Sequence, residues 1–266
     1  MPHNKPFHRN FRELVQSESS SYSSRAYIVD KGYAKSPHHY TRAFLILQQD
    51  IRNLFEYIEP ADTNLNTFSY KIYELLVRTC IEVEANFKAI FRENIFIPTY
   101  VSGSKAGQQR TEKYWNIKDY ELINKTHHLD NYFVEFPFWR GEKFKYQPFL
   151  EWQNSNGSLA WYQAYNGCKH DRDEKFELAN LENLLNAFSG LFVLLSSQFN
   201  CESFNPGGTS LSLQIDSYFE GKFGIGDYLK IKFPTNWQES EKYDFDWLDL
   251  KNEDTRFEKF DYNNIR

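Results

Sequence analysis

The sequence predicts an α+β protein that is predominantly helical, with an irregular insertion and a small C-terminal antiparallel β-sheet. Three observations support this prediction. Apolar residues recur every three or four positions through several long stretches before residue 205, which is the period of an amphipathic helix. Pro and Gly interrupt this period between about residues 97 and 157. After residue 205 the apolar period changes to two, which is typical of strands.

The first two predicted helices form an antiparallel pair. The first begins after Pro37, ends before Pro60, and carries an apolar stripe of Phe44, Leu47, Ile51, Leu54 and Ile58. The second is longer, and Ser69, or Thr67 before it, is a plausible N-cap. Its stripe consists of Ile72, Leu76, Cys80, Val83, Phe87 and Ile90. A short link between two such helices favours antiparallel packing.

Two further helices are predicted after the insertion. One begins at Ser158, a good N-cap, and ends at about Lys169. The other follows the sequence DRDEK and covers residues 176–199. Its apolar residues lie on more than one face, so we expect it to be the most buried helix of the protein.

Strands are predicted in two regions. The segment EFPFWRGEKFKYQPF, residues 135–149, suggests two short strands or extended arms around Arg140-Gly141. SLSLQIDSYF, YLKIKFP and YDFDWLDL, residues 210–219, 228–234 and 243–250, alternate apolar and polar residues. These patterns divide the chain into three parts. Residues 1–36 form an irregular segment with a polar, disordered run at 17–24. Residues 37–204 form a helical bundle with its insertion at about 97–157, and residues 205–266 form a β-rich segment that packs on the bundle.

Composition excludes several classes of function. The chain of 266 residues is 41% hydrophobic and 18% aromatic, which is ample for a core. A net charge of -5 argues against non-specific nucleic-acid binding. Cys80, Cys168 and Cys201 have neither metal-site spacing nor a disulfide pattern, so a reducing compartment fits best. With no apolar span or signal-like N-terminus, we expect a cytoplasmic protein that does not contact a membrane.

The segment WYQAYNGCKHDR, Trp161–Arg172, is the best candidate for chemistry. Asn166 and His170 are four residues apart and therefore lie on the same face of a helix, with Lys169 beside them. Histidine titrates near neutral pH, so His170 is the candidate for proton transfer. The alternative is a structural histidine that interacts with the dipole at the helix C-terminus.

Acidic side chains on the long second helix extend this candidate site. Glu84 lies near the apolar stripe, where a carboxylate needs a partner, and it could orient His170 or pair with Lys169 or Arg172. We therefore expect Asn166, Lys169 and His170 to lie close to Glu84 or Glu82. Arg78 and Glu82, four residues apart, are expected to form a solvated ion pair.

No cofactor or metal site is predicted. The pairs His38-His39 and His127-His128 are adjacent and point in different directions, and no HExxH spacing is present. The sequence also lacks GxGxxG, GxxxxGK[ST] and GxSxG motifs, so these motifs give no support for a nucleotide-binding or hydrolase function.

A helical bundle with N-x-x-x-H at the end of one helix, followed by a very apolar helix, resembles the HEPN superfamily. Members are all-α domains widespread in bacterial defence and toxin–antitoxin systems, and many are metal-independent RNases. The family signature is an Arg, often followed by Asn, then a short spacer and His. Asn166 and His170 match the later positions, whereas Tyr165 occupies the position of the Arg.

The resemblance covers residues 40–95 and 158–200, and it implies a homodimer because HEPN sites are commonly completed across a two-fold axis. The segments YIEP, EVEANFKAI and YNGCKHDR also resemble a family of uncharacterised bacterial proteins with a YNxxKHxR motif. That second resemblance implies a helical core and no particular activity.

Two functions from different classes follow. The first is a HEPN-like interaction or accessory protein of a bacterial defence or toxin–antitoxin type system, without strong catalysis, whose partner is encoded nearby. The second is a metal-independent endoribonuclease that binds RNA. Its catalytic set would be His170, Asn166, Lys169, Arg172 and Glu84, with His170 as general acid or base and Lys169 or Arg172 replacing the missing Arg. The acidic charge and Tyr165 favour the first function.

Overall fold

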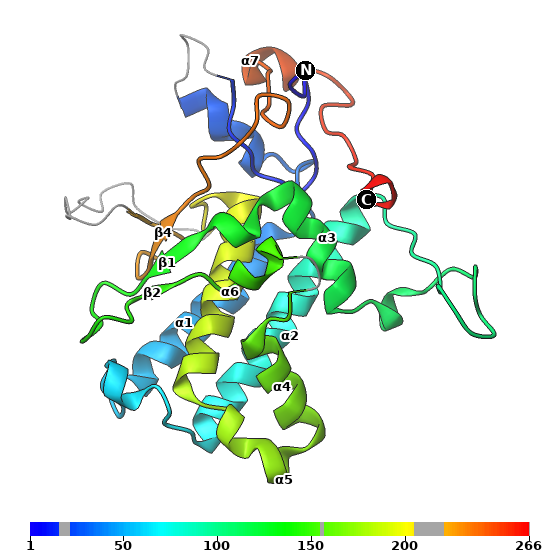
Figure 1. The fold of residues 1–266 in the computed structure, drawn as a ribbon. Coiled ribbons are helices and arrows are strands. Elements are labelled where there is room, and N and C mark those ends of the chain that lie inside the picture. The colour runs from blue at the N-terminus through cyan, green and yellow to red at the C-terminus, as the bar shows by residue number, and fades with distance from the viewer. Residues whose placement is uncertain (16–21, 155–156, 205–220, 266) are drawn as a thin grey trace. The chain divides into compact units, whose positions relative to one another are not determined.

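The fold is mixed α+β and mostly helical. The structure is a computed structural model that describes residues 1–15, 22–154, 157–204 and 221–265. Seven α-helices and a four-stranded antiparallel sheet occur in these ranges (Figure 1). The chain forms two compact units: unit 1 comprises Met1–Lys35, Ala85–His128 and Thr235–Arg266, and unit 2 comprises Ser36–Glu84 and Leu129–Pro234. Of the predicted polar run at 17–24, residues 17–21 lie outside the described residues, and residues 22–24 begin a 3₁₀ helix, Tyr22–Val29, that the predicted irregular segment 1–36 did not include.

Helices α1 and α2 agree with their sequence patterns. Helix α1 covers Pro37–Leu54, with Pro37 in the first turn, where its missing N–H costs nothing. Helix α2 covers Tyr70–Glu93, and the Ser69 hydroxyl accepts a hydrogen bond from the Ile72 N–H at 3.2 Å, which confirms the predicted cap. All residues of the two predicted stripes are buried except Ile58, which lies beyond the end of α1 and is half-buried.

The Arg78–Glu82 ion pair on α2 was predicted incorrectly. The Arg78 guanidinium lies 2.6 Å from an Asp50 carboxylate oxygen on α1 and 3.3 Å from a carboxylate oxygen of Glu74. Arg78 can reach a carboxylate on a neighbouring helix, which the spacing along one helix cannot reveal. The bridge to Asp50 fastens the first part of α2 to α1 within unit 2.

Helices α4, α5 and α6 follow one another closely. Helix α4 covers Ala160–His170, α5 covers Arg172–Lys175 and α6 covers Leu181–Phe199. The N-cap residue of α4 is Leu159 and not the predicted Ser158, and the Leu159 side chain makes no capping hydrogen bond. Helix α6 starts later than predicted, where the Asn180 side chain accepts a hydrogen bond from the Asn183 N–H. Sixteen of the nineteen residues of α6 are buried, as expected from its apolar faces.

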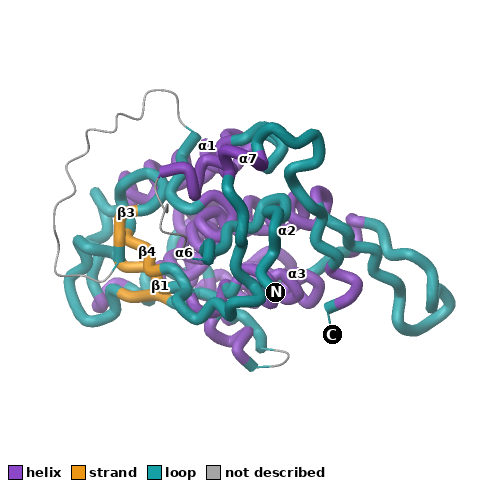
Figure 2. Tube along the Cα trace, turned by 90° about the horizontal axis from the view of Figure 1, so that it is seen from above, coloured by secondary structure: helices purple, strands orange, loops and turns teal. Residues whose placement is uncertain are grey.

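The sheet of unit 2 combines strands from distant parts of the chain. Its strands are β1 Phe133–Glu135, β2 Lys145–Tyr146, β3 Lys222–Phe223 and β4 Lys230–Lys232, in the order β2-β1-β4-β3. The predicted arms around Arg140-Gly141 are therefore a real hairpin, with Val134 opposite Tyr146. Figure 2 shows β1, β3 and β4 side by side next to α6. Residues 228–234 contain β4 as predicted, whereas the strand predicted at 210–219 lies outside the described residues.

The segment YDFDWLDL in unit 1 is not the predicted strand. Asp246 accepts a hydrogen bond from the Leu248 N–H and begins the short helix α7, Trp247–Leu250. The alternation of apolar and polar residues nevertheless has the expected consequence for burial. The rings of Tyr243, Phe245 and Trp247 lie within 6.4 Å of the buried Tyr27 ring, while the intervening aspartates are exposed. The cap at Asp246 makes the backbone helical here, while the alternation of apolar and polar residues decides which side chains are buried.

Unit 1 is built around a packed N-terminal segment. Residues 1–15 contain no helix, as predicted, but they pair with the C-terminal segment through bridges between His3 and Tyr243 and between Phe7 and Glu258. The guanidinium of Arg12 is buried and lies 5.2 Å from the centre of the Phe7 ring. Unit 1 also contains α3, Ile117–His127, which the sequence analysis placed in the irregular insertion. Its start is fixed by a capping box between Asn116 and Asp119.

Among the described helices, none has both the length and the apolar character needed to cross a bilayer.

Candidate functional site

The YNGCKHDR segment forms a helix end that folds back on itself. Helix α4 ends at His170, and the Asp171 N–H donates to the carbonyl of Gly167 at 2.9 Å. The Cys168 thiol then donates to the carbonyl of Lys175 at 3.0 Å. A Cβ atom on Gly167 would lie 3.2 Å from the Lys175 side chain, so glycine lets the following turn pack closely against α4. Gly167 and Cys168 of this segment therefore serve to pack the turn after α4 against the helix.

A polar network connects α4 to α2 within unit 2. The Tyr162 hydroxyl donates a hydrogen bond to a carboxylate oxygen of Glu84 at 3.0 Å. The Tyr165 hydroxyl is also hydrogen-bonded to Glu84, and it accepts a hydrogen bond from the Lys169 amine at 3.2 Å. Both tyrosines are buried, and Glu84 is half-buried. Glu84 thus has partners on α4, as expected for a carboxylate close to an apolar stripe.

The electrostatics of this network keep its hydroxyl and thiol groups neutral. Burial raises the pKa of the Tyr165 hydroxyl, and the nearby Glu84 carboxylate raises it further. Burial also raises the pKa of the Cys80 thiol well above its ordinary value, with Glu84 adding to the effect and Lys169 opposing it. A buried thiol and a buried phenol with raised pKa values are poor nucleophiles and poor general bases.

The predicted site residues separate into two groups. Glu84 and Lys169 are brought together through Tyr165. His170 is exposed, and the described part of the chain offers it no hydrogen bond or ion pair. Asn166 is half-buried on the preceding turn, and it too has no hydrogen bond to Glu84 or Glu82 in the described ranges. Of the three, only Lys169 is linked to an acidic residue of α2, and that link is indirect, through the Tyr165 hydroxyl.

Arg172 lies against aromatic rings instead of beside His170. Its guanidinium is 5.9 Å from the centre of the Tyr70 ring and 5.8 Å from that of Tyr73. The Phe176 ring packs on the same two tyrosines, at 4.9 and 6.0 Å between ring centres. Such cation–π contacts at an exposed site contribute about 0.5–1 kcal/mol each. The role of Arg172 in the structure is to hold the turn after α4 against the start of α2.

Tyr165, the central member of the network, was not predicted to belong to the site. It was noted only at the position where the HEPN signature has an Arg, and Cys80 was predicted as a stripe residue. One signal could have identified the tyrosines, because a buried Tyr hydroxyl needs a partner and Glu84 needs one too. Among the described residues, no group of three or more His, Cys, Asp or Glu side chains is placed to hold a metal ion.

The site and fold define a mostly helical α+β protein with a tyrosine–glutamate–lysine network between two helices. The chain gives no significant match to any protein-family model, to any curated protein or to any solved structure.

Replacing Tyr165 by phenylalanine tests whether the network stabilises the fold. We expect the free energy of unfolding to fall by about 1–3 kcal/mol, because Glu84 and Lys169 lose a buried hydrogen-bond partner. Urea unfolding followed by circular dichroism measures the change. Tyr70→Phe is the matched control, since the Tyr70 side chain is 68% exposed, and it should alter stability by less than about 0.5 kcal/mol. Equal effects of the two substitutions would contradict a stabilising network.

Proposed function

We propose that this chain is a HEPN-like interaction or accessory protein of a bacterial defence or toxin–antitoxin type system, without strong catalysis. In this proposal it acts as a homodimer and binds a protein encoded by a neighbouring gene. The observation that carries the proposal is the engagement of Tyr165. At the position where the family has an Arg, this chain has a buried phenol whose hydroxyl is bonded to Glu84 and Lys169.

The hydrogen bonds of this network argue against phosphate chemistry. An RNase of this type needs a cation that can approach the scissile phosphate and a histidine that is positioned to transfer a proton. The Lys169 amine is directed to the Tyr165 hydroxyl, and the Arg172 guanidinium lies over two tyrosine rings. His170 is exposed with no described residue to orient it. The groups required by catalysis are therefore used in packing or left unoriented.

The alternative function is a metal-independent endoribonuclease. Its support is the exposure of His170 next to Lys169 at the end of α4, where an RNA could reach both. A homodimer could supply the missing cation from its second copy. If the protein is a nuclease, cleavage of RNA requires His170. An RNA-cleavage assay therefore separates the two functions.

The test is cleavage of labelled single-stranded RNAs of varied sequence by the purified protein in the presence of a chelator. We expect no cleavage by wild type beyond that of His170→Ala. His38→Ala is the matched control, because His38 is another exposed histidine of the same unit. If wild type and His38→Ala cleave RNA and His170→Ala is about 100-fold or more slower, the nuclease function replaces the proposed one.

The interaction part of the proposal is tested separately. The protein is co-expressed with the products of its neighbouring genes, and complexes are examined by size-exclusion chromatography with light scattering. A complex of fixed stoichiometry supports the accessory role. A monomer that forms no complex with any of these products, together with inactivity on RNA, would refute it.

A further inference from the structure

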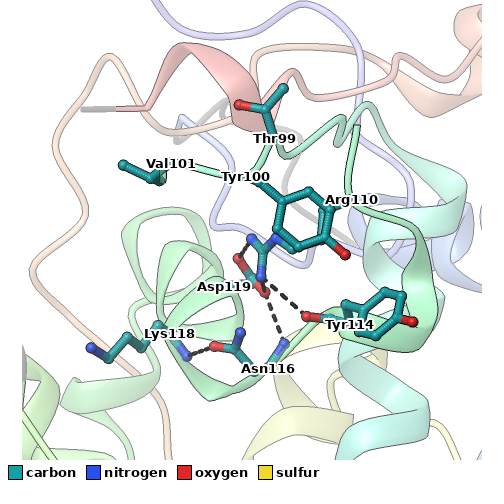
Figure 3. Close-up of a pocket in the computed structure, with 8 residues that line it drawn as sticks. All are labelled: Thr99, Tyr100, Val101, Arg110, Tyr114, Asn116, Lys118 and Asp119. Carbon is teal, nitrogen blue, oxygen red and sulfur yellow. Dashed lines mark hydrogen bonds and ion pairs between the residues drawn. The ribbon is translucent and has the colours of Figure 1, made fainter. Parts of the chain in front are cut away.

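An open pocket in unit 1 has no part in the network described above. Its volume is about 550 Å³, and it is lined by Thr99, Tyr100, Val101, Arg110, Tyr114, Asn116, Lys118 and Asp119 (Figure 3). These residues come from the loop before α3 and from the first turn of α3. Pockets that bind small molecules have volumes of about 300–1,000 Å³, so this one is large enough for a single compact ligand.

Two tyrosine rings form the apolar part of the pocket. The centres of the Tyr100 and Tyr114 rings are 6.2 Å apart, with the ring planes inclined at 59°. The Tyr114 side chain is 49% exposed and Val101 is almost fully exposed, so these surfaces face solvent. A planar aromatic ligand could stack on either ring, because the faces of aromatic rings attract other π-systems.

The acidic and amide groups of the pocket are already used within the protein. The Arg110 guanidinium forms a bidentate pair with the Asp119 carboxylate, with one N–O distance of 2.9 Å and a second contact of 2.5 Å. The Asn116 side chain accepts a hydrogen bond from the Lys118 N–H, and Asp119 caps the Asn116 N–H, as Figure 3 shows. Arg110 and Asp119 therefore neutralise each other's charge.

Three lysines remain to bind a ligand. The Lys105 amine lies 5.8 Å from the centre of the Tyr100 ring, the Lys113 amine lies 5.8 Å from that of Tyr114, and Lys118 lines the pocket. None of the three forms an ion pair with any residue in the described ranges. The nearby Glu112 and Asp119 are each paired with an arginine. One lysine of the lining and two lysines beside its tyrosines thus place positive charge at and around the pocket, in a protein whose net charge is -5.

We propose that this pocket binds a nucleoside phosphate, with its base stacked on Tyr100 or Tyr114 and its phosphate attracted by Lys118 of the lining and by Lys105 and Lys113 beside the two tyrosines. The ligand class follows from the two features together: ring faces select a flat apolar group, and unpaired amines select an anion. A free mononucleotide fits better than a nucleic-acid strand. The pocket has room for about one nucleotide, whereas a strand needs a charged groove that follows several phosphates.

Binding is measured on the full-length protein by isothermal titration calorimetry with AMP, adenosine, inorganic phosphate and a single-stranded hexa-adenylate. We expect AMP to bind more tightly than adenosine or phosphate alone, and its affinity to fall as the salt concentration rises. Binding of the hexa-adenylate without binding of AMP would overturn the mononucleotide proposal. Absence of AMP binding at millimolar concentration would also overturn it.

Substitutions separate the two halves of the pocket. The double variant Tyr100→Ala/Tyr114→Ala should bind AMP at least about tenfold more weakly, and Tyr100→Phe/Tyr114→Phe should retain affinity because the rings remain. Lys105→Gln/Lys113→Gln/Lys118→Gln should reduce AMP affinity to that of adenosine. The control Lys125→Gln removes an exposed lysine of the same unit outside the pocket and should change nothing.

Circular dichroism of every variant verifies that the fold is retained. AMP affinity that is unchanged in both the tyrosine-to-alanine variant and the triple lysine variant would place any binding elsewhere and overturn the assignment. This inference is independent of the proposed function, because the pocket and the α4 network share no residue.

Discussion

Replacing Glu93 by glutamine is expected to lower the free energy of unfolding by about 3–5 kcal/mol. The Glu93 carboxylate lies at the end of α2 in unit 1 and is only 8% exposed. It binds the Nε of the fully buried Arg9 at 2.5 Å and accepts the Lys35 N–H at 2.9 Å. Glutamine has nearly the same shape but no charge, so the buried Arg9 guanidinium would lose the charge–charge attraction of its Glu93 partner. Equilibrium unfolding in urea at neutral pH measures the loss.

The matched control for this prediction is Glu253→Gln. Glu253 forms an ion pair with Lys5 in the same unit, but its side chain is 52% exposed. Exposed ion pairs contribute about 0–1 kcal/mol, since water and salt screen them. A loss at Glu93 no larger than that at Glu253 would show that the Arg9–Glu93 pair is not effectively buried. If Glu93→Gln fails to fold, the stability of Glu93→Asp, which keeps the charge, is compared with that of Glu253→Gln instead.

The stability of the protein is expected to fall as the pH decreases below about 6.5, with His127 responsible for a large part of the loss. Its ring lies in the interior of unit 1, where burial lowers the pKa of His127 from 6.5 to about 3. The Nε2 atom is 2.9 Å from the carbonyl oxygen of Arg9, and Nδ1 is 2.8 Å from the Thr126 hydroxyl. Folding therefore requires the neutral ring, whereas the unfolded chain binds a proton below its ordinary pKa.

The sign and size of the effect follow from this difference. Above pH 6.5 both states are neutral and His127 adds no pH dependence. Between about pH 6.5 and 3 the unfolded state holds one more proton, so each pH unit costs about 1.4 kcal/mol. Lowering the pH from 7 to 5 should thus remove about 2 kcal/mol of stability through this group. Urea unfolding at the two pH values, compared between wild type and His127→Gln, isolates its contribution.

A control variant and an NMR titration test whether His127 causes this pH dependence. His3 and His8 also have lowered pKa values because of burial, and the comparison with the His127 variant subtracts their contribution. The exposed His38→Gln serves as control and should keep the wild-type pH dependence. In wild type, the imidazole C–H resonances of His127 should not titrate between pH 8 and 5. Titration near pH 6.5 would contradict the buried, neutral ring.

Several parts of the fold were predictable because they depend on short-range patterns. The period of apolar residues located α1, α2 and α6, and Ser69 marked the start of α2. Turn residues at Arg140-Gly141 revealed the hairpin of β1 and β2. Helix α3 was missed because its polar face and the preceding Pro and Gly residues resembled a loop. Its capping box, Asn116 with Asp119, was the available signal.

The candidate site was predictable only in part. The sequence suggested that Glu84 needed a partner, and the partners it has are tyrosines of α4, with Lys169 linked to it only through Tyr165. It also suggested that Asn166 and His170 would approach the acidic residues of α2, and the described structure gives no such contact. Spacing of four residues places two side chains on one helical face, but it does not determine which face packs against the neighbouring helix.

By itself, the sequence determined the helical character of the chain and the buried faces of α1, α2 and α6, because these depend on composition and periodicity. The tertiary structure alone decided that residues 1–15 pack against the C-terminal segment, that strands from two distant regions share one sheet, and that Arg78 binds Asp50. It also decided that Tyr165 closes a network with Glu84. These contacts join residues far apart in the chain, and their formation depends on packing and desolvation that no local pattern encodes.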